Sequence, residues 1–100
     1  MITEEIEIAK KIFAIVEQGI IDGYDSFEYR VEAHDGYMEE ELLVTMDSET
    51  TSNVRRDYSS AMLHQLVVDL KERMYERGDR WKSFVMSCRE GENVNFNFEY

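Results

Sequence analysis

Apolar side chains near the start of the chain recur at the spacing of a helix. Ile8, Ile12 and Val16 fall on one stripe, and glutamates occupy the first turn, where the helix dipole favours negative charge. A threonine that can cap the N-terminus and a glycine that can end the helix enclose this stripe. The pattern predicts a helix over Thr3–Gly19.

A second helical pattern lies in the other half of the chain. Its apolar stripe consists of Leu63, Leu66, Val67, Leu70 and Met74. The helix is predicted from about Val54 to Arg77, with Ser52 or Asn53 as its N-cap. Gly78 follows a group of cations, which is typical of a helix C-terminus.

Four other stretches alternate apolar and polar residues, the period of a strand with one buried face. They are Phe27–His34, Tyr37–Met46, Trp81–Cys88 and Val94–Tyr100. Asp35-Gly36 separates the first two stretches and is a strong signal for a hairpin turn. Asp47–Asn53 contains no apolar residue and is predicted to be a loop.

The predicted order of elements is α-β-β-α-β-β, within a single globular domain over residues 1–100. The fold class is α+β, with a four-stranded, mainly antiparallel sheet. Two amphipathic helices need an apolar surface to cover, and one face of the sheet supplies it. The other face is then left towards water.

A two-residue turn at Asp35-Gly36 would set the register of the first hairpin. It pairs Glu32 with Glu39 and Arg30 with Glu41. The outward face then carries the four glutamates Glu28, Glu32, Glu39 and Glu41. Glu40 falls on the apolar side, and we attribute this exception to a position near the open end of the hairpin.

The net charge of −11 comes entirely from the first half of the chain. Residues 1–50 hold fourteen acids and three bases, whereas residues 51–100 hold eight of each. This imbalance argues against direct binding of nucleic acid or an anionic membrane. It favours a basic protein partner, although the same acids also serve to keep a protein in solution.

Two aromatic residues are candidates for the same contact surface. Tyr37 follows the hairpin turn on the outward face. Trp81 shares the alternation of Ser83 and Val85, which points it outward as an interface anchor. Its position at the start of the strand also allows packing over the end of the helix layer.

The sequence offers little support for catalysis or for a bound cofactor. Paired carboxylates act as acid and base only where their surroundings separate their pKa values, and an open sheet does not do this. His34 and His64 show no metal-ligand spacing, and a glycine-rich phosphate loop is lacking. Cys88 alternates into the core and is read as a buried structural thiol. We therefore expect no enzyme activity, no metal and no cofactor.

The start of the chain is acidic, and no apolar run has the length of a membrane span. A lone cysteine cannot form an internal disulfide, which is typical of a reducing compartment. We therefore expect a cytoplasmic protein without a membrane partner.

The C-terminal pattern resembles that of the YezG-like immunity proteins. It comprises Trp81 and Ser83 opening a strand, Gly91 in the turn, and Phe98 and Tyr100 closing the last strand. The α-β-β-α-β-β order and the acidic first hairpin are similar over nearly the whole chain. A further helical or extended tail is associated with that family, whereas this sequence ends at Tyr100.

The resemblance implies a non-enzymatic antitoxin that neutralises a toxin, often a nuclease, used by bacteria against competitors. Because a nuclease handles phosphates, its cleft would be basic and would attract an acidic protein. The residues expected to contact this partner are Glu28, Glu32, Tyr37, Glu39, Glu41 and Trp81. The alternative is a general interaction domain, monomeric or homodimeric, that pairs through its last strand or its outer sheet face.

Overall fold

Two helices and five strands make up residues 3–52 and 56–100, the part of the chain that the computed structural model describes. The elements are α1 (Thr3–Gly19), β1 (Ser26–His34), β2 (Tyr37–Met46), β3 (Glu49–Thr51), α2 (Ser60–Glu76), β4 (Ser83–Arg89) and β5 (Asn95–Glu99). The class is α+β, as the sequence predicts.

The predicted register of the first hairpin is confirmed. β1 and β2 are antiparallel, with His34 opposite Tyr37 and Glu32 opposite Glu39. Gly36 in the turn has a φ of 85°, in the left-handed region that glycine enters without a steric penalty. The turn sets which residues of β1 and β2 are opposite each other, and the alternation of side chains along each strand then places every second residue on the same side of the sheet.

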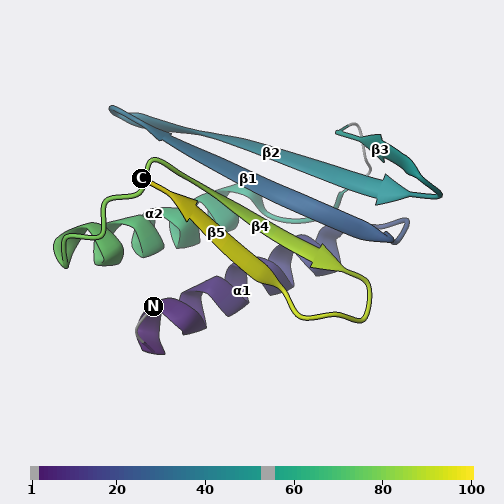
Figure 1. The fold of residues 1–100 in the computed structure, drawn as a ribbon, viewed down its shortest axis with the longest axis horizontal. Helices are drawn as coiled ribbons and strands as arrows, with labels where there is room; N and C mark the ends of the chain where they lie inside the picture. The colour runs from purple at the N-terminus through teal and green to yellow at the C-terminus, as the bar shows by residue number, and fades with distance from the viewer. Residues whose placement is uncertain (1–2, 53–55) are drawn as a thin grey trace.

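The sheet has five strands in the order β3-β2-β1-β4-β5, and all neighbours are antiparallel (Figure 1). The prediction of four strands is wrong, because β3 lies within the segment predicted as a loop. Asp47 and Ser48, with φ of 52° and 68°, turn the chain back onto β2. The hydroxyls of Thr45 and Thr50 then hydrogen-bond across the two strands at 2.7 Å.

The second helix begins later than predicted. Ser59 is its N-cap, and the Ser59 hydroxyl accepts a hydrogen bond from the Met62 backbone N–H at 3.2 Å. Ser52 lies in a bend after β3, while Asn53 and Val54 lie outside the described residues. The chain before the helix is held by tertiary pairing, since Arg56 forms an isolated bridge with Ile20.

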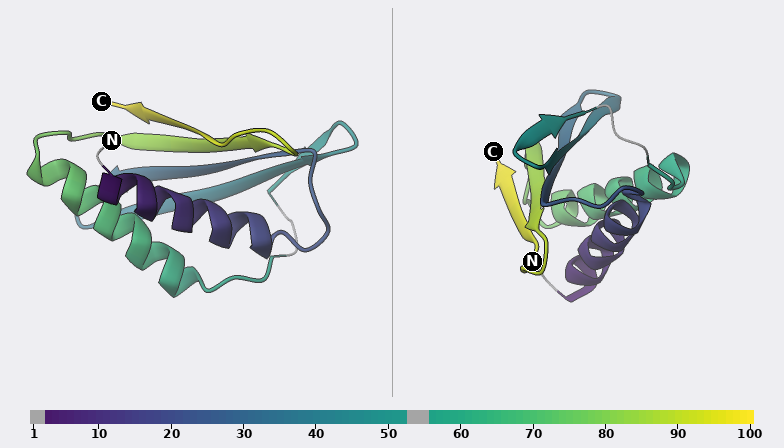
Figure 2. Two further views of the ribbon diagram at one scale, coloured as in Figure 1. Left: turned by 90° about the horizontal axis from the view of Figure 1, so that it is seen from below. Right: turned by 90° about the vertical axis from the view of Figure 1, so that its right-hand side faces the viewer.

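Both helices cover one face of the sheet and leave the other face open (Figures 1 and 2). The core lies between these two layers. It includes Ile12 and Val16 of α1, Leu63, Val67 and Leu70 of α2, and Phe27, Tyr29, Leu42, Val44, Phe84 and Met86 of the sheet. Phe96 and Phe98 of β5 pack against this core on the same side of the sheet as their partners Met86 and Phe84. Within the described ranges, neither helix has the length and apolar character needed to cross a bilayer.

An ion pair joins the start of α1 to the end of α2. The buried Glu5 carboxylate accepts hydrogen bonds from Arg77 Nε at 2.8 Å and from Arg77 Nη2 at 2.7 Å. Nη2 also lies 2.9 Å from the Asp79 carboxylate. Hydrogen bonding to Arg77 lowers the pKa of Glu5 by more than burial raises it. The guanidinium thus links the first turn of α1 to the C-terminal end of α2.

Candidate protein-binding face

The sheet surface away from the helices, here called the outer face, is organised in cross-strand rows. The first row runs Glu39, Glu32, Ser83 and Glu99 across β2, β1, β4 and β5. The next row runs Glu41, Arg30, Val85 and Asn97. The third row runs Leu43, Glu28, Ser87 and Asn95. These three rows place five glutamates and Arg30 on one surface that no helix covers, and the next row, which runs Thr45, Ser26 and Arg89, adds a second arginine.

Of the predicted glutamates, Glu32, Glu39 and Glu41 are exposed and Glu28 is half-buried, and part of their charge is neutralised from within the chain. Arg30 Nη2 lies 2.7 Å from the Glu28 carboxylate, and Arg30 Nη1 lies 3.9 Å from that of Glu41. Glu32 and Glu39 keep 60% and 62% of their side-chain surface exposed and have no arginine or lysine partner among the described ion pairs. Two guanidiniums, those of Arg30 and Arg89, against five carboxylates leave the outer face negative.

Tyr37 and His34 form the end of the outer face next to the hairpin turn. Their rings stack at a centroid distance of 4.7 Å and an interplanar angle of 17°. Tyr37 is 58% exposed, so its ring is accessible beside the acidic row, as the sequence predicts. His34 was not predicted as part of this surface, although its place two residues from Glu32 on the same strand face follows from the register.

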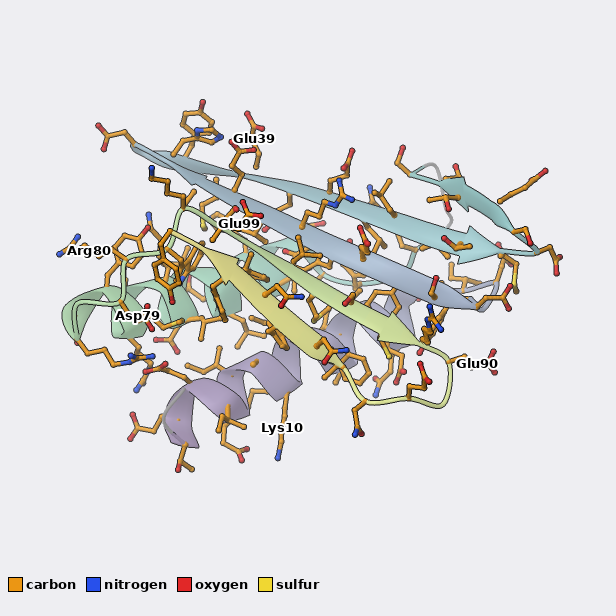
Figure 3. All side chains as sticks on the ribbon, in the orientation of Figure 1. Lys10, Glu39, Asp79, Arg80, Glu90 and Glu99 are labelled. Carbon is orange, nitrogen blue, oxygen red and sulfur yellow. The ribbon has the colours of Figure 1, made fainter. Side chains whose placement is uncertain are left out.

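Glu99 is the fifth glutamate of the outer face, and sequence reasoning did not assign it to the contact surface. The sequence places Glu99 on the outward side of its strand, but only the pairing of β4 with β1 aligns it with Glu32. Figure 3 shows Glu39 and Glu99 at the same end of the sheet. Between them lies an open depression of about 570 Å³, lined by both glutamates and by Glu32, Ser83 and Val85.

Trp81 does not lie on the outer face, contrary to the outward position predicted from the strand alternation. It precedes β4, so the strand alternation that pointed it outward does not reach it. The side chain is 0% exposed and packs against Phe84 and Phe98 with ring centroids 5.3 and 5.8 Å away. A fully buried indole cannot touch a partner, and packing is therefore its role.

Glu40 lies on the helix side of the sheet, as the register predicts, but a position near the open end of the hairpin does not explain this. It is opposite Val31, closer to the turn than to the open end of the hairpin. Its carboxylate lies 3.9 Å from His64 Nδ1 on α2. Burial, reinforced by the nearby Glu40, raises the pKa of the Tyr29 phenol. Glu40 therefore faces α2 and adds nothing to the outer face.

The cysteine has the surroundings of a structural thiol. Cys88 is buried, and its Sγ lies 3.3 Å from the Arg89 carbonyl oxygen. Burial raises the pKa of the Cys88 thiol, which keeps it in the unreactive protonated form. The prediction of a buried cysteine is confirmed.

A second depression, of about 470 Å³, lies between the first hairpin and α2. The Tyr75 ring has Lys71 Nζ and the Arg80 guanidinium within 5.1 and 5.2 Å of its centroid. Glu72 and Glu76 line the same depression. Its mixed charges give it no electrostatic preference comparable to that of the outer face.

A comparison with protein-family models gives no match for the chain, and neither does a comparison with curated proteins. The resemblance to YezG-like immunity proteins therefore stays a prediction made from the sequence.

Proposed function

We propose that the protein is a non-enzymatic binding protein that neutralises a toxin by covering a basic surface with its outer face. The observation that carries this proposal is the excess of carboxylates on a sheet surface free of helices. Such a surface steers an oppositely charged partner into place and disfavours wrong partners. The exposure of Glu32 and Glu39 leaves them ready for new ion pairs.

The intramolecular contacts divide the glutamates into two groups. Glu28 already accepts two hydrogen bonds from Arg30, so a partner would have to compete for it. Glu32, Glu39 and Glu41 are held less tightly, since Arg30 Nη1 lies 3.9 Å from Glu41, and Glu32 and Glu39 have only the imidazole of His34 at 3.6 Å. We therefore assign the main electrostatic contacts to these three residues, with Tyr37 as the adjacent aromatic contact.

The toxin part of the proposal comes from the resemblance to YezG-like immunity proteins. Many toxins of that kind are nucleases, whose active clefts must attract phosphate. An acidic protein that fills such a cleft presents carboxylates where the nucleic acid would present phosphates. The placement of carboxylates where phosphates would lie supports inhibition by mimicry of substrate charge. Such a mode of inhibition predicts that association with the toxin slows as salt is added.

Charge reversal of Glu32, Glu39 and Glu41 together to lysine is expected to abolish protection against the toxin encoded beside this gene. Affinity should fall at least about 100-fold, because each reversal replaces attraction with repulsion. The measurement is survival on co-expression, followed by binding of the purified pair. The matched control reverses Glu72, Glu76 and Glu90, which are exposed away from the outer face and give the same net charge. Protection that survives in the outer-face variant, or is lost equally in the control, would refute the assignment.

The alternative function, self-association, is disfavoured for the outer face because two such faces would repel each other. β5 does lie at an edge of the sheet, where a second copy could pair with it. We expect light scattering to give the mass of one chain, 11.9 kDa, at both low and moderate salt. A stable dimer whose mass does not depend on salt would favour pairing through β5.

A further inference from the structure

We propose that Glu32, His34 and Glu39 form a binding site for one divalent transition-metal ion of the zinc class. His34 Nε2 lies 3.6 Å from Glu32 Oε1 and 3.6 Å from Glu39 Oε1. The three ligand atoms all lie within 4.8 Å of one another. This arrangement comes from the register, which places the glutamates opposite each other and the imidazole one step along the same face.

The two distances from His34 Nε2 match those around a metal ion better than those of a hydrogen-bonded cluster. Zinc bonds to nitrogen and oxygen ligands are about 2.0–2.2 Å long, so two ligands of a tetrahedral ion are roughly 3.4 Å apart. A distance of 3.6 Å needs only a small shift of each carboxylate. It is too long for a normal hydrogen bond between nitrogen and oxygen.

The state of the imidazole is the second observation that points to a ligand. The His34 side chain is 29% exposed, but its Nε2 is shielded from solvent and no described residue hydrogen-bonds to it. The ring is held in place by stacking on Tyr37, which fixes the direction of the nitrogen towards the two carboxylates. A buried polar atom without a partner is costly, and a metal ion bound at Nε2 would remove that cost.

The donor set selects the class of ion. One imidazole nitrogen and two carboxylate oxygens suit zinc and its neighbours in the transition series, whereas magnesium and calcium prefer oxygen alone. A dication would also relieve the repulsion between Glu32 and Glu39, which face each other across the strands. Three protein ligands leave a fourth position of a tetrahedral ion open.

The site is tested by titrating zinc chloride into the full chain by calorimetry, with excess magnesium present to occupy unspecific carboxylates. One zinc ion per chain is expected. Glu39→Gln and His34→Gln should each weaken binding at least about tenfold, and Glu39→Gln leaves the stacked rings in place. His64→Gln is the matched control, because the chain has two histidines and His64 lies on α2, beside Glu40. Zinc affinity that is equal in the wild type and both site variants, or that falls in the His64 variant alone, would overturn the site.

Glu32 and Glu39 are shared with the proposed toxin contact, but the zinc titration needs no protein partner, so its outcome does not depend on the toxin proposal. The resonances of the His34 ring should shift on zinc addition while those of His64 stay in place. Shifts confined to His64 would also overturn the site.

Discussion

Replacing Trp81 with alanine is expected to lower the free energy of unfolding by about 3–5 kcal/mol, the cost of removing a large buried aromatic side chain. The indole is 0% exposed and contacts rings from three parts of the chain. These are Tyr75 of α2 at 5.8 Å, Phe84 of β4 at 5.3 Å and Phe98 of β5 at 5.8 Å. The indole therefore ties a helix to the last hairpin, and its removal leaves a cavity at that junction.

The measurement is urea unfolding followed by circular dichroism, because Trp81 is the only tryptophan and its fluorescence is lost in the variant. A loss of this size is a large part of the 5–15 kcal/mol that is typical of a whole domain. Trp81→Phe serves as the control and should lose less, since it keeps an aromatic ring against Phe84. A Trp81→Ala variant of unchanged stability would contradict the packing role and return Trp81 to the surface.

The position of Trp81 shows where the period-two pattern stops predicting the direction of a side chain. The period-two pattern correctly places Phe84, Met86 and Cys88 inside, since all three are buried. Extending it two residues back to Trp81 fails, because β4 begins only at Ser83. Outside a strand the backbone is free to turn the side chain, and the large apolar indole turns inward.

The first hairpin was predictable because local signals agreed. Asp35-Gly36 sets a two-residue turn, and the flanking residues alternate without a break until Glu40. β3 gave no such signal. All three of its residues are exposed, and it is held by backbone pairing to Val44, Thr45 and Met46. A strand that buries no side chain leaves no hydrophobic pattern to read.

The candidate site was predictable only within the hairpin. Glu28, Glu32, Glu39 and Glu41 share one outward face as their spacing requires. The contribution of Glu99 depends on β4 lying beside β1, and strand order is a property of the tertiary packing of the two hairpins. The late start of α2 has a similar cause, because the segment ahead of it is held by the bridge from Arg56 to Ile20.

Replacing Glu5 with glutamine is expected to lower the free energy of unfolding by about 2 kcal/mol at neutral pH. Breaking a fully buried ion pair costs about 3–5 kcal/mol, and an exposed pair contributes about 0–1 kcal/mol. The Glu5–Arg77 pair lies between these limits, since Glu5 is 0% exposed and the Arg77 side chain is 37% exposed. Urea unfolding of wild type and variant gives the difference directly.

The dependence on pH separates the ion pair from simple loss of packing. Hydrogen bonding to Arg77 holds the pKa of Glu5 in the folded protein below its ordinary value of 4.5. The unfolded chain therefore binds the proton first as pH falls, and the stability contributed by the carboxylate is complete above about pH 4.5. It is lost as pH falls through the lower folded value, so the wild-type and Glu5→Gln curves should converge in acid.

The matched control is Glu4→Gln, which removes a carboxylate from the same first turn of α1. Both substitutions lose the same favourable interaction with the helix dipole, worth about 0.3–1 kcal/mol. Glu4 pairs with Arg73, but the Glu4 side chain is 71% exposed, so losing this ion pair should lower the free energy of unfolding only slightly beyond the loss of the dipole interaction. Equal losses in the two variants, or a Glu5→Gln deficit that persists undiminished in acid, would show that the contact between the helices depends on packing and not on the buried charge.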